Sequence, residues 1–240
     1  MRIFFILLLF CSSCTSSLYK FPERNWQDLS VAEKIKLQKL AFNQSGIESF
    51  RFLITVRSKR KDERVSFRQA VVLTKTNNLT IETYPIHAAY LLNKFEANEQ
   101  TFLSQDFQEE TREQGQVTPD VFEKYFSIPL TINELLAILT ARVSEDWLES
   151  EGSSSLLIAI DRDRESFANS QKTLSFQLDS SGQRLSQFSK YSSFAKKLIF
   201  TVSYLQWQEF QGKQLPQLIQ LSLPRYDMEV SIAVKPIALN

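Results

Sequence analysis

The spacing of apolar residues along the chain changes from helical to alternating. Ser30-Val31-Ala32-Glu33 is a capping-box sequence, and Ile35, Leu37 and Leu40 follow it at helical spacing. From Phe50 onward, apolar and polar residues alternate, which is typical of a half-buried antiparallel strand. The pattern therefore predicts one amphipathic helix that ends near residue 42, followed by β structure.

The alternating segments form two groups separated by a helical region. Short polar turns join consecutive segments, and no regular alternation of strands and helices occurs, which favours one antiparallel sheet. We predict an α+β fold, a curved antiparallel sheet of about eleven strands that forms an incomplete barrel covered by a few helices. The expected strands lie near 50–57, 65–73, 79–83, 89–95, 101–103, 156–160, 173–178, 184–191, 198–207, 216–223 and 227–234.

The helical region between the two groups has its own start signals. Thr118-Pro119 places a capping residue before a proline, and Thr131-Ile132-Asn133-Glu134 is a second capping box. The second helix is apolar on more than half of its circumference, which fits burial between two layers or a lid over an apolar cavity. No strand is assigned to the polar stretch 105–116, and the region near residue 150 is predicted to be a crossing within one sheet.

The first residues have the pattern of a secretory signal. The apolar run from Ile3 to Phe10 follows Arg2 and is too short to span a bilayer. Cys11-Ser12-Ser13-Cys14 resembles the lipobox of bacterial lipoproteins, which implies removal of residues 1–13 and acylation of Cys14, with palmitate among the acyl groups. The alternative is an ordinary signal peptide that leaves a cysteine in place.

The lipobox resemblance also implies a location. An acylated Cys14 holds a protein on a membrane without a spanning helix. Thr15, in place of an aspartate, favours the outer membrane, with the protein facing the periplasm. We expect a signal peptide over residues 1–13, a tether over 14–28 and a single domain over 29–240.

Composition excludes several kinds of site. The chain has 28 basic and 27 acidic side chains, a formal charge of +1, which argues against nucleic-acid binding. One histidine and two cysteines are too few for a zinc or iron–sulfur centre, and no phosphate-binding glycine motif occurs. We expect no metal, no cofactor and no catalytic residue. An enzyme, dependent on His87 or on acidic pairs in polar loops such as Glu109/Glu110, is the least favoured interpretation.

Three local strings resemble those of the LolB-like outer-membrane lipoproteins, in the same order. They are Phe126–Leu130 followed by Glu134–Leu139, then Gly212–Leu221, then the ending Val234–Asn240. The resemblance runs from about Gly46 to the end of the chain. It implies an open antiparallel half-barrel whose concave apolar face is covered by helices, leaving a cavity for acyl chains.

The resemblance also assigns candidate sites. Tyr84–Ala88 takes the place of a protruding loop, in which Pro85 and Ile86 would meet a membrane or a ligand; the alternative is that Ile86 packs under the sheet edge. The candidates for the acyl-chain cavity share the apolar face of a strand or helix, and the same residues could form a filled core. They are Phe50, Phe52, Ile54, Val56, Phe67, Leu73, Leu135, Leu136 and Leu139.

These features together predict an outer-membrane-anchored lipoprotein that binds acyl chains. It would help to receive lipoproteins or to insert them in the outer membrane, with no chemical step. Its expected partners are the acyl chains of lipoproteins, a periplasmic LolA-like carrier and the membrane, and we expect a monomer. The alternative is an envelope lipoprotein that uses the same fold as a protein-interaction scaffold.

Overall fold

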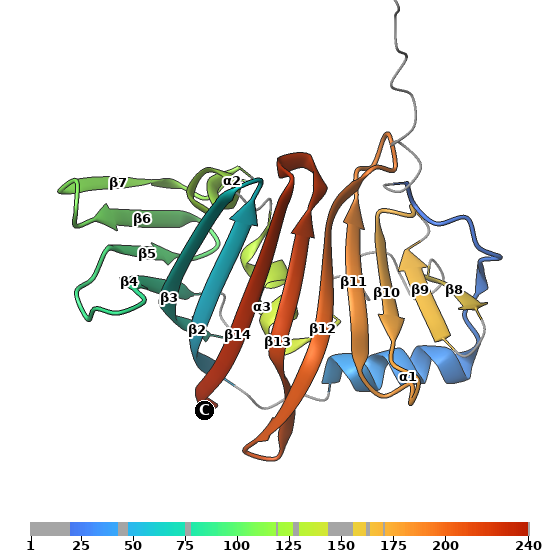
Figure 1. Ribbon diagram of the computed structural model, residues 1–240. Helices are drawn as coiled ribbons and strands as arrows, with labels where there is room; N and C mark the ends of the chain where they lie inside the picture. Colours follow the sequence, from blue (N-terminus) through green and yellow to red (C-terminus); the bar gives the residue numbers. More distant parts are fainter. Residues whose placement is uncertain are drawn as a thin grey trace, which may run out of the picture.

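In the part of the chain that the structure describes, the fold is a single open sheet with three α-helices (Figure 1). The computed structural model describes residues 20–42, 48–74, 78–118, 120–126, 130–143, 156–161, 164–169 and 171–239. The predicted signal peptide and Cys14 lie outside these residues. In chain order the elements are β1 (Gln27–Asp28), α1 (Val31–Phe42), β2 (Ser49–Arg60), β3 (Glu63–Thr74), β4 (Leu79–Pro85), β5 (Asn93–Ala97), β6 (Thr101–Asp106), β7 (Thr111–Gln116), α2 (Val121–Phe126), α3 (Ile132–Thr140), β8 (Leu156–Asp161), β9 (Arg164–Asn169), β10 (Leu174–Leu178), β11 (Leu185–Tyr191), β12 (Leu198–Phe210), β13 (Lys213–Leu223), the 3₁₀ turn η1 (Pro224–Tyr226) and β14 (Met228–Leu239).

The fourteen strands are hydrogen-bonded in the order β1-β8-β9-β10-β11-β12-β13-β14-β2-β3-β4-β5-β6-β7. All neighbours are antiparallel, and β14 joins the two halves by pairing with β2 from Met228↔Arg60 to Leu239↔Phe50. β1 and β7 are the two edges, so the sheet is unclosed. The predicted incomplete barrel is confirmed in outline, with fourteen strands rather than about eleven among the described residues. The region near residue 150, predicted to be a crossing within one sheet, lies outside the described residues, although the strands described before and after it belong to one sheet.

Three strands escaped prediction because they lack apolar alternation. β7 is an edge strand with exposed residues on both faces, and its backbone pairing with β6 holds it in the polar stretch to which no strand was assigned. β9 has four consecutive buried residues because both of its faces are covered. β1 is only two residues long. β5 also begins at Asn93, later than the predicted start at residue 89.

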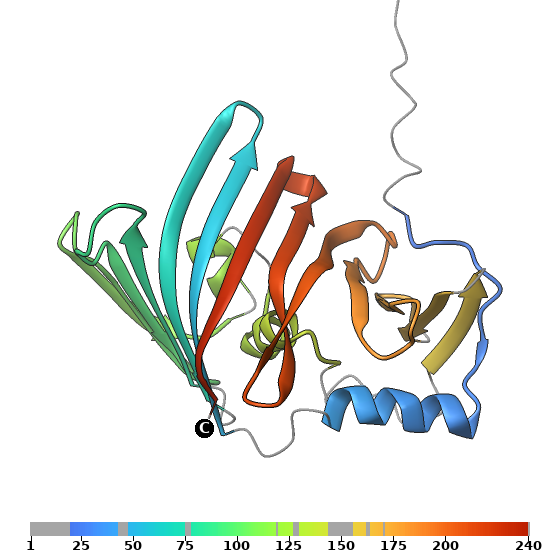
Figure 2. The same cartoon turned by 60° about the horizontal axis from the view of Figure 1, so that its bottom comes forward.

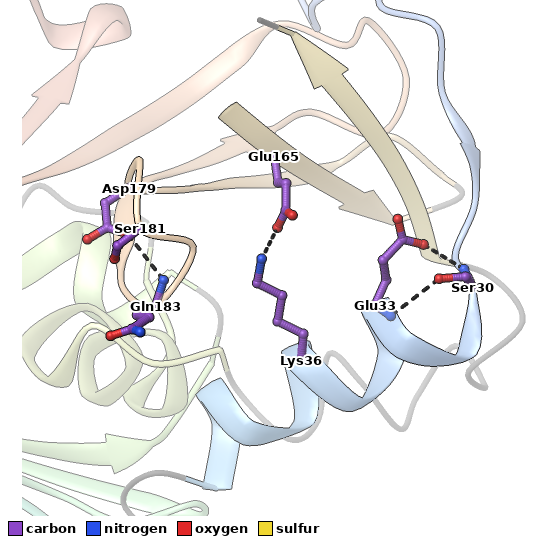
Figure 3. Close-up of polar contacts among 7 residues, drawn as sticks. All are labelled: Ser30, Glu33, Lys36, Glu165, Asp179, Ser181 and Gln183. Carbon is purple, nitrogen blue, oxygen red and sulfur yellow. Dashed lines mark hydrogen bonds and ion pairs between the residues drawn. The ribbon is translucent and has the colours of Figure 1, made fainter. Parts of the chain in front are cut away.

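Helix α1 is fixed to the sheet at its first two turns (Figure 3). The amide of Ser30 donates to Glu33 Oε2 over 2.7 Å, and the amide of Glu33 donates to Ser30 Oγ over 3.4 Å, which confirms the predicted capping box. Lys36 Nζ lies 2.5 Å from Glu165 Oε2 on β9. Leu37 is buried, but Ile35 is 47 % exposed, so the expectation that Ile35 lies on the buried face of this amphipathic helix is wrong.

The N-terminal segment covers the other face of the same strands. Phe21 is buried against Tyr191, with ring centroids 4.9 Å apart, and Trp26 packs beside it. β1 then pairs with β8 at the sheet edge. The segment predicted to be a tether is described from Lys20, and from there it lies against the sheet. Neighbouring residues of β9 therefore meet α1 on one face and this segment on the other.

The sheet curves around helices α2 and α3, which lie on its concave side (Figure 2). Thr131 Oγ1 accepts from the amide of Glu134 over 3.1 Å, and Glu134 Oε2 accepts from the amide of Thr131 over 2.9 Å. This confirms the second capping box. The helix ends where Ala141 adopts a left-handed conformation and its amide bonds back to the last turn. Five apolar residues of α3 are buried: Ile132, Leu136, Ala137, Ile138 and Leu139.

Candidate functional site: an apolar cavity under the concave sheet

An apolar cavity of about 500 Å³ lies between the concave face of the sheet and helices α2 and α3. β2, β3, β4 and β14 supply its wall, and the two helices supply its cover. Most of the lining side chains are apolar. They are Ile54, Val56, Ser58, Val65, Ser66, Phe67, Gln69, Ile81, Thr83, Leu92, Asn93, Phe122, Tyr125, Phe126, Leu130, Leu135, Leu139, Met228, Val230 and Ile232.

Strand register explains why these side chains meet. Val56 pairs with Phe67 on β3 and with Ile232 on β14, so three apolar side chains lie side by side on one face. Because side chains alternate, every second residue of β2 lies on the concave face of the sheet, and the intervening residues face outward. The outward-facing Thr55, for example, pairs with Arg68.

One polar pair interrupts the apolar wall. Gln69 and Thr83 are both buried, and Gln69 Nε2 donates to Thr83 Oγ1 over 3.1 Å. Gln69 is paired with Ile54 in an unbroken register between β2 and β3. Its side chain therefore faces the cavity by regular alternation and not because of a bulge in β3. The hydrogen bond satisfies part of the hydrogen-bonding capacity of both side chains. It places a bonded polar pair among apolar neighbours in the cavity wall.

Helix α2 covers the cavity with aromatic side chains. Phe122, Tyr125 and Phe126 all line it, and each packs on Phe95 of β5, with ring centroids 5.7, 5.3 and 5.2 Å from that of Phe95. Phe95 is itself buried. Contacts of this kind are stronger than area burial alone predicts, so α2 is attached to β5 by one aromatic cluster.

Ion pairs attach both covering helices to the sheet. Lys190 Nζ of β11 lies 2.5 Å from Glu134 Oε1 of α3. On α2, Glu123 accepts hydrogen bonds from Tyr226 and from Arg225 of η1. The hydrogen bond to Glu123 raises the pKa of the Tyr226 hydroxyl, with a smaller contribution from burial. Both contacts therefore tie the cover to the part of the sheet that runs from β11 to β14.

The structure separates the nine predicted cavity residues into two sets. Ile54, Val56, Phe67, Leu135 and Leu139 line the cavity. Phe50, Phe52, Leu73 and Leu136 are buried in the adjoining core. All nine share apolar faces, and sequence alone could not separate them because the difference depends on how far the helices reach along the sheet.

The lining also includes residues that the sequence did not single out. Val230 and Ile232 alternate regularly along β14, and Phe122 and Tyr125 lie on the predicted apolar face of α2. The sequence could have identified these residues as apolar-face candidates from that periodicity. The position of β14 beside β2 was not, because two strands so distant in the chain pair only through the topology of the sheet.

The predicted loop begins beside the cavity. Pro85 ends β4 and pairs with Phe67, while Ile86 follows it and is partly buried. The guanidinium of Arg68 donates to the carbonyl oxygens of Pro85, over 3.2 Å, and Ala88, over 2.6 Å. Leu92, which lines the cavity, closes the loop by donating its amide to the carbonyl of Thr83.

Neither a metal site nor a spanning helix is found in the part of the chain that the structure describes. Within it, no three His, Cys, Asp or Glu residues come together in a way that could hold a metal ion. None of its helices is both long enough and apolar enough to cross a membrane.

Solved structures share this curved sheet with its helical cover. A LolA superfamily protein from Nitrosomonas europaea superposes with a TM-score of 0.61 at 12% identity, covering 86% of this chain and 93% of the other. The chain has a LolA/LolB-like fold. An outer-membrane lipoprotein-sorting protein domain from Vibrio parahaemolyticus matches this LolA/LolB-like fold with a TM-score of 0.56 at 9% identity, over 86% and 92% of the two chains.

A third solved structure has the same arrangement. A DUF1329 family protein from Desulfovibrio piger matches with a TM-score of 0.57 at 7% identity, over 87% of this chain and 92% of the other. No protein-family model matches the sequence, and no curated protein matches it. The likeness to LolA/LolB-like proteins therefore lies in the fold.

Proposed function

We propose that this protein is a lipoprotein, anchored in the outer membrane through Cys14, that binds acyl chains in the cavity. In this proposal it receives lipoproteins from a periplasmic LolA-like carrier, or inserts them in the outer membrane, without a chemical step. The protein acts as a monomer facing the periplasm. The fold, shared with a LolA superfamily protein and with a lipoprotein-sorting domain, is consistent with such a role.

The apolar cavity is the observation that carries the proposal. A methylene group occupies about as much space as a water molecule, roughly 30 Å³, so a volume of about 500 Å³ fits on the order of one long acyl chain. Each methylene removed from water contributes about 0.8 kcal/mol. A filled core would have favoured the scaffold interpretation instead.

Filling the cavity tests the proposal. We expect Val56→Phe to weaken the binding of a fluorescent fatty acid by about tenfold, equivalent to about 1.4 kcal/mol, because the added ring takes space that the ligand needs. The matched control is Thr55→Phe, which places the same side chain one residue earlier, on the outward face of β2. Fluorescence titration gives the affinity, and circular dichroism verifies that both variants are folded.

Two outcomes contradict a carrier. One is the absence of fatty-acid binding by the unaltered protein, and the other is equal affinity for Val56→Phe and Thr55→Phe. If mass spectrometry of the native protein then shows no lipid while an envelope protein co-purifies, the scaffold function replaces the carrier function.

A further inference from the structure

Several turns at one end of the sheet carry exposed apolar and basic side chains. Because neighbouring strands are antiparallel, the turns that follow β2, β13, β11 and β9 lie at the same end of adjacent strands. We call these turns, with the ends of their strands, the upper rim, which is the upper side of the sheet in Figure 2. The turns at the opposite end follow β5, β10 and β12.

Phe194 is the most exposed large apolar side chain among the described residues. It lies in the β11–β12 turn and is 99 % exposed. The turn is held closed beneath it, since the amide of Ser192 donates to the carbonyl of Lys197 and the amide of Lys196 donates to the carbonyl of Ser192. Phe194 is thus presented to solvent by a well-bonded turn, next to the cations Lys196 and Lys197.

The N-terminal segment enters the fold at this same turn. Lys20 forms a β-bridge with Lys197, and the amide of Phe21 donates to the carbonyl of Lys196. Cys14 precedes Lys20 by six residues, which span at most about 20 Å when extended. If Cys14 carries the lipid anchor, as proposed above, the upper rim is therefore held close to the membrane.

The β2–β3 hairpin makes the rim basic. Lys59 and Arg64 are directly opposite each other on the outward face, and Arg57 lies on the same face of β2. Like charges in this position destabilise a hairpin. Glu229 of β14 lies directly opposite Lys59 and accepts a hydrogen bond from Ser222, but among the described residues it forms no ion pair with these three cations. Such an arrangement suits a surface that meets anions.

The inward face of the same hairpin borders the cavity. Ser58, Val65 and Phe67 line it, and Val65 is 55 % exposed. One hairpin therefore carries the cavity lining on its inner face and cations on its outer face.

We propose that the upper rim is a docking surface for anionic phospholipid membranes, with Phe194 inserted among the headgroups and the β2–β3 cations on phosphates. Apolar insertion and cationic contact are the two attractions that hold proteins at such a surface. The inference deepens the proposed carrier function, because it places the cavity-bordering hairpin against the bilayer that receives the cargo.

Vesicle flotation of residues 15–240 tests the docking surface, since every described helix and strand lies within that range. We expect binding to vesicles of phosphatidylcholine with phosphatidylglycerol, little binding to phosphatidylcholine alone, and weaker binding as salt rises. Phe194→Ser should weaken binding about fivefold. Its control is Ile160→Ser, at a side chain that is 67 % exposed on β8, away from the rim.

A second set of variants tests the cations. Each cation near an anionic surface contributes about fivefold, so Arg57→Gln/Lys59→Gln/Arg64→Gln should reduce binding on the order of 100-fold. Arg51→Gln/Lys213→Gln/Lys235→Gln removes the same charge from positions away from the rim. No preference for anionic vesicles, or equal loss in the test and control variants, would overturn the docking surface. The affinity of these variants for a fluorescent fatty acid, measured in parallel, should equal that of the unaltered protein. Failure of the unaltered protein to bind the fatty acid would contradict the carrier function and not the docking surface.

Discussion

At the residue scale, the ion pair between Lys190 and Glu134 includes a carboxylate that is almost fully buried. The Glu134 side chain is 7% exposed and serves two partners at once, the amide of Thr131 at the helix start and the ammonium of Lys190. A buried carboxylate without its counter-ion lowers the stability of the folded protein by several kcal/mol, whereas an exposed ion pair contributes little to that stability. This one contact therefore joins the helix start to the sheet.

We expect Lys190→Met to lower the free energy of unfolding by about 2 kcal/mol, because Glu134 remains buried without its cation. Urea denaturation measures the change. The control is Lys124→Met, which breaks the exposed pair with Glu113 and should shift the urea midpoint little. Equal losses in both variants would show that burial does not distinguish the two pairs.

At the scale of elements, the loop after β4 is shaped by Arg68. Its two hydrogen bonds hold the carbonyls of Pro85 and Ala88, so Ile86 is carried at a defined position between them. The loop closes at Leu92 beside the cavity. The apolar side chain of Ile86, in a loop beside the cavity, fits the proposed passage of a ligand between the cavity and a membrane.

We expect Ile86→Glu to lower lipoprotein transfer to vesicles about tenfold, because a carboxylate does not enter the apolar part of a bilayer. Fatty-acid uptake should be unchanged. His87→Glu adds the same charge at the exposed neighbouring residue and is the control. A normal transfer rate for Ile86→Glu would remove the loop from the mechanism.

Elements with one buried face were predictable from the sequence, and elements with two similar faces were not. β2 and β14 alternate clearly, and both capping boxes marked their helices. β7 and β9 gave no alternation, since one is exposed on both faces and the other is buried on both. Cavity and core residues were mixed for a related reason, because Val56 and Phe52 share one face of one strand.

At the scale of the whole molecule, the N-terminal segment is part of the folded structure. Phe21 is 9% exposed and packs on Tyr191, and β1 covers the open edge of β8. Without that cover, β8 would present unpaired backbone groups, a position prone to unwanted pairing with other chains. A domain trimmed at residue 29 would therefore lose both contacts.

We expect Phe21→Ala to lower the free energy of unfolding by about 3 kcal/mol, the usual cost of removing a buried ring. The measurement is urea denaturation. Phe194→Ala removes the same side chain from a fully exposed position and should leave stability nearly unchanged. Similar stability of both variants would mean that the N-terminal segment contributes no packing energy.

The position of β14 at the centre of the sheet also bears on how the chain folds. β14 is last in chain order, yet it lies between β13 and β2 and supplies Met228, Val230 and Ile232 to the cavity. Neither half of the sheet can join the other until this strand has left the ribosome. Pairing over so long a sequence separation is slow, so the cavity, which takes part of its wall from β14, is complete only when the last described strand is in place.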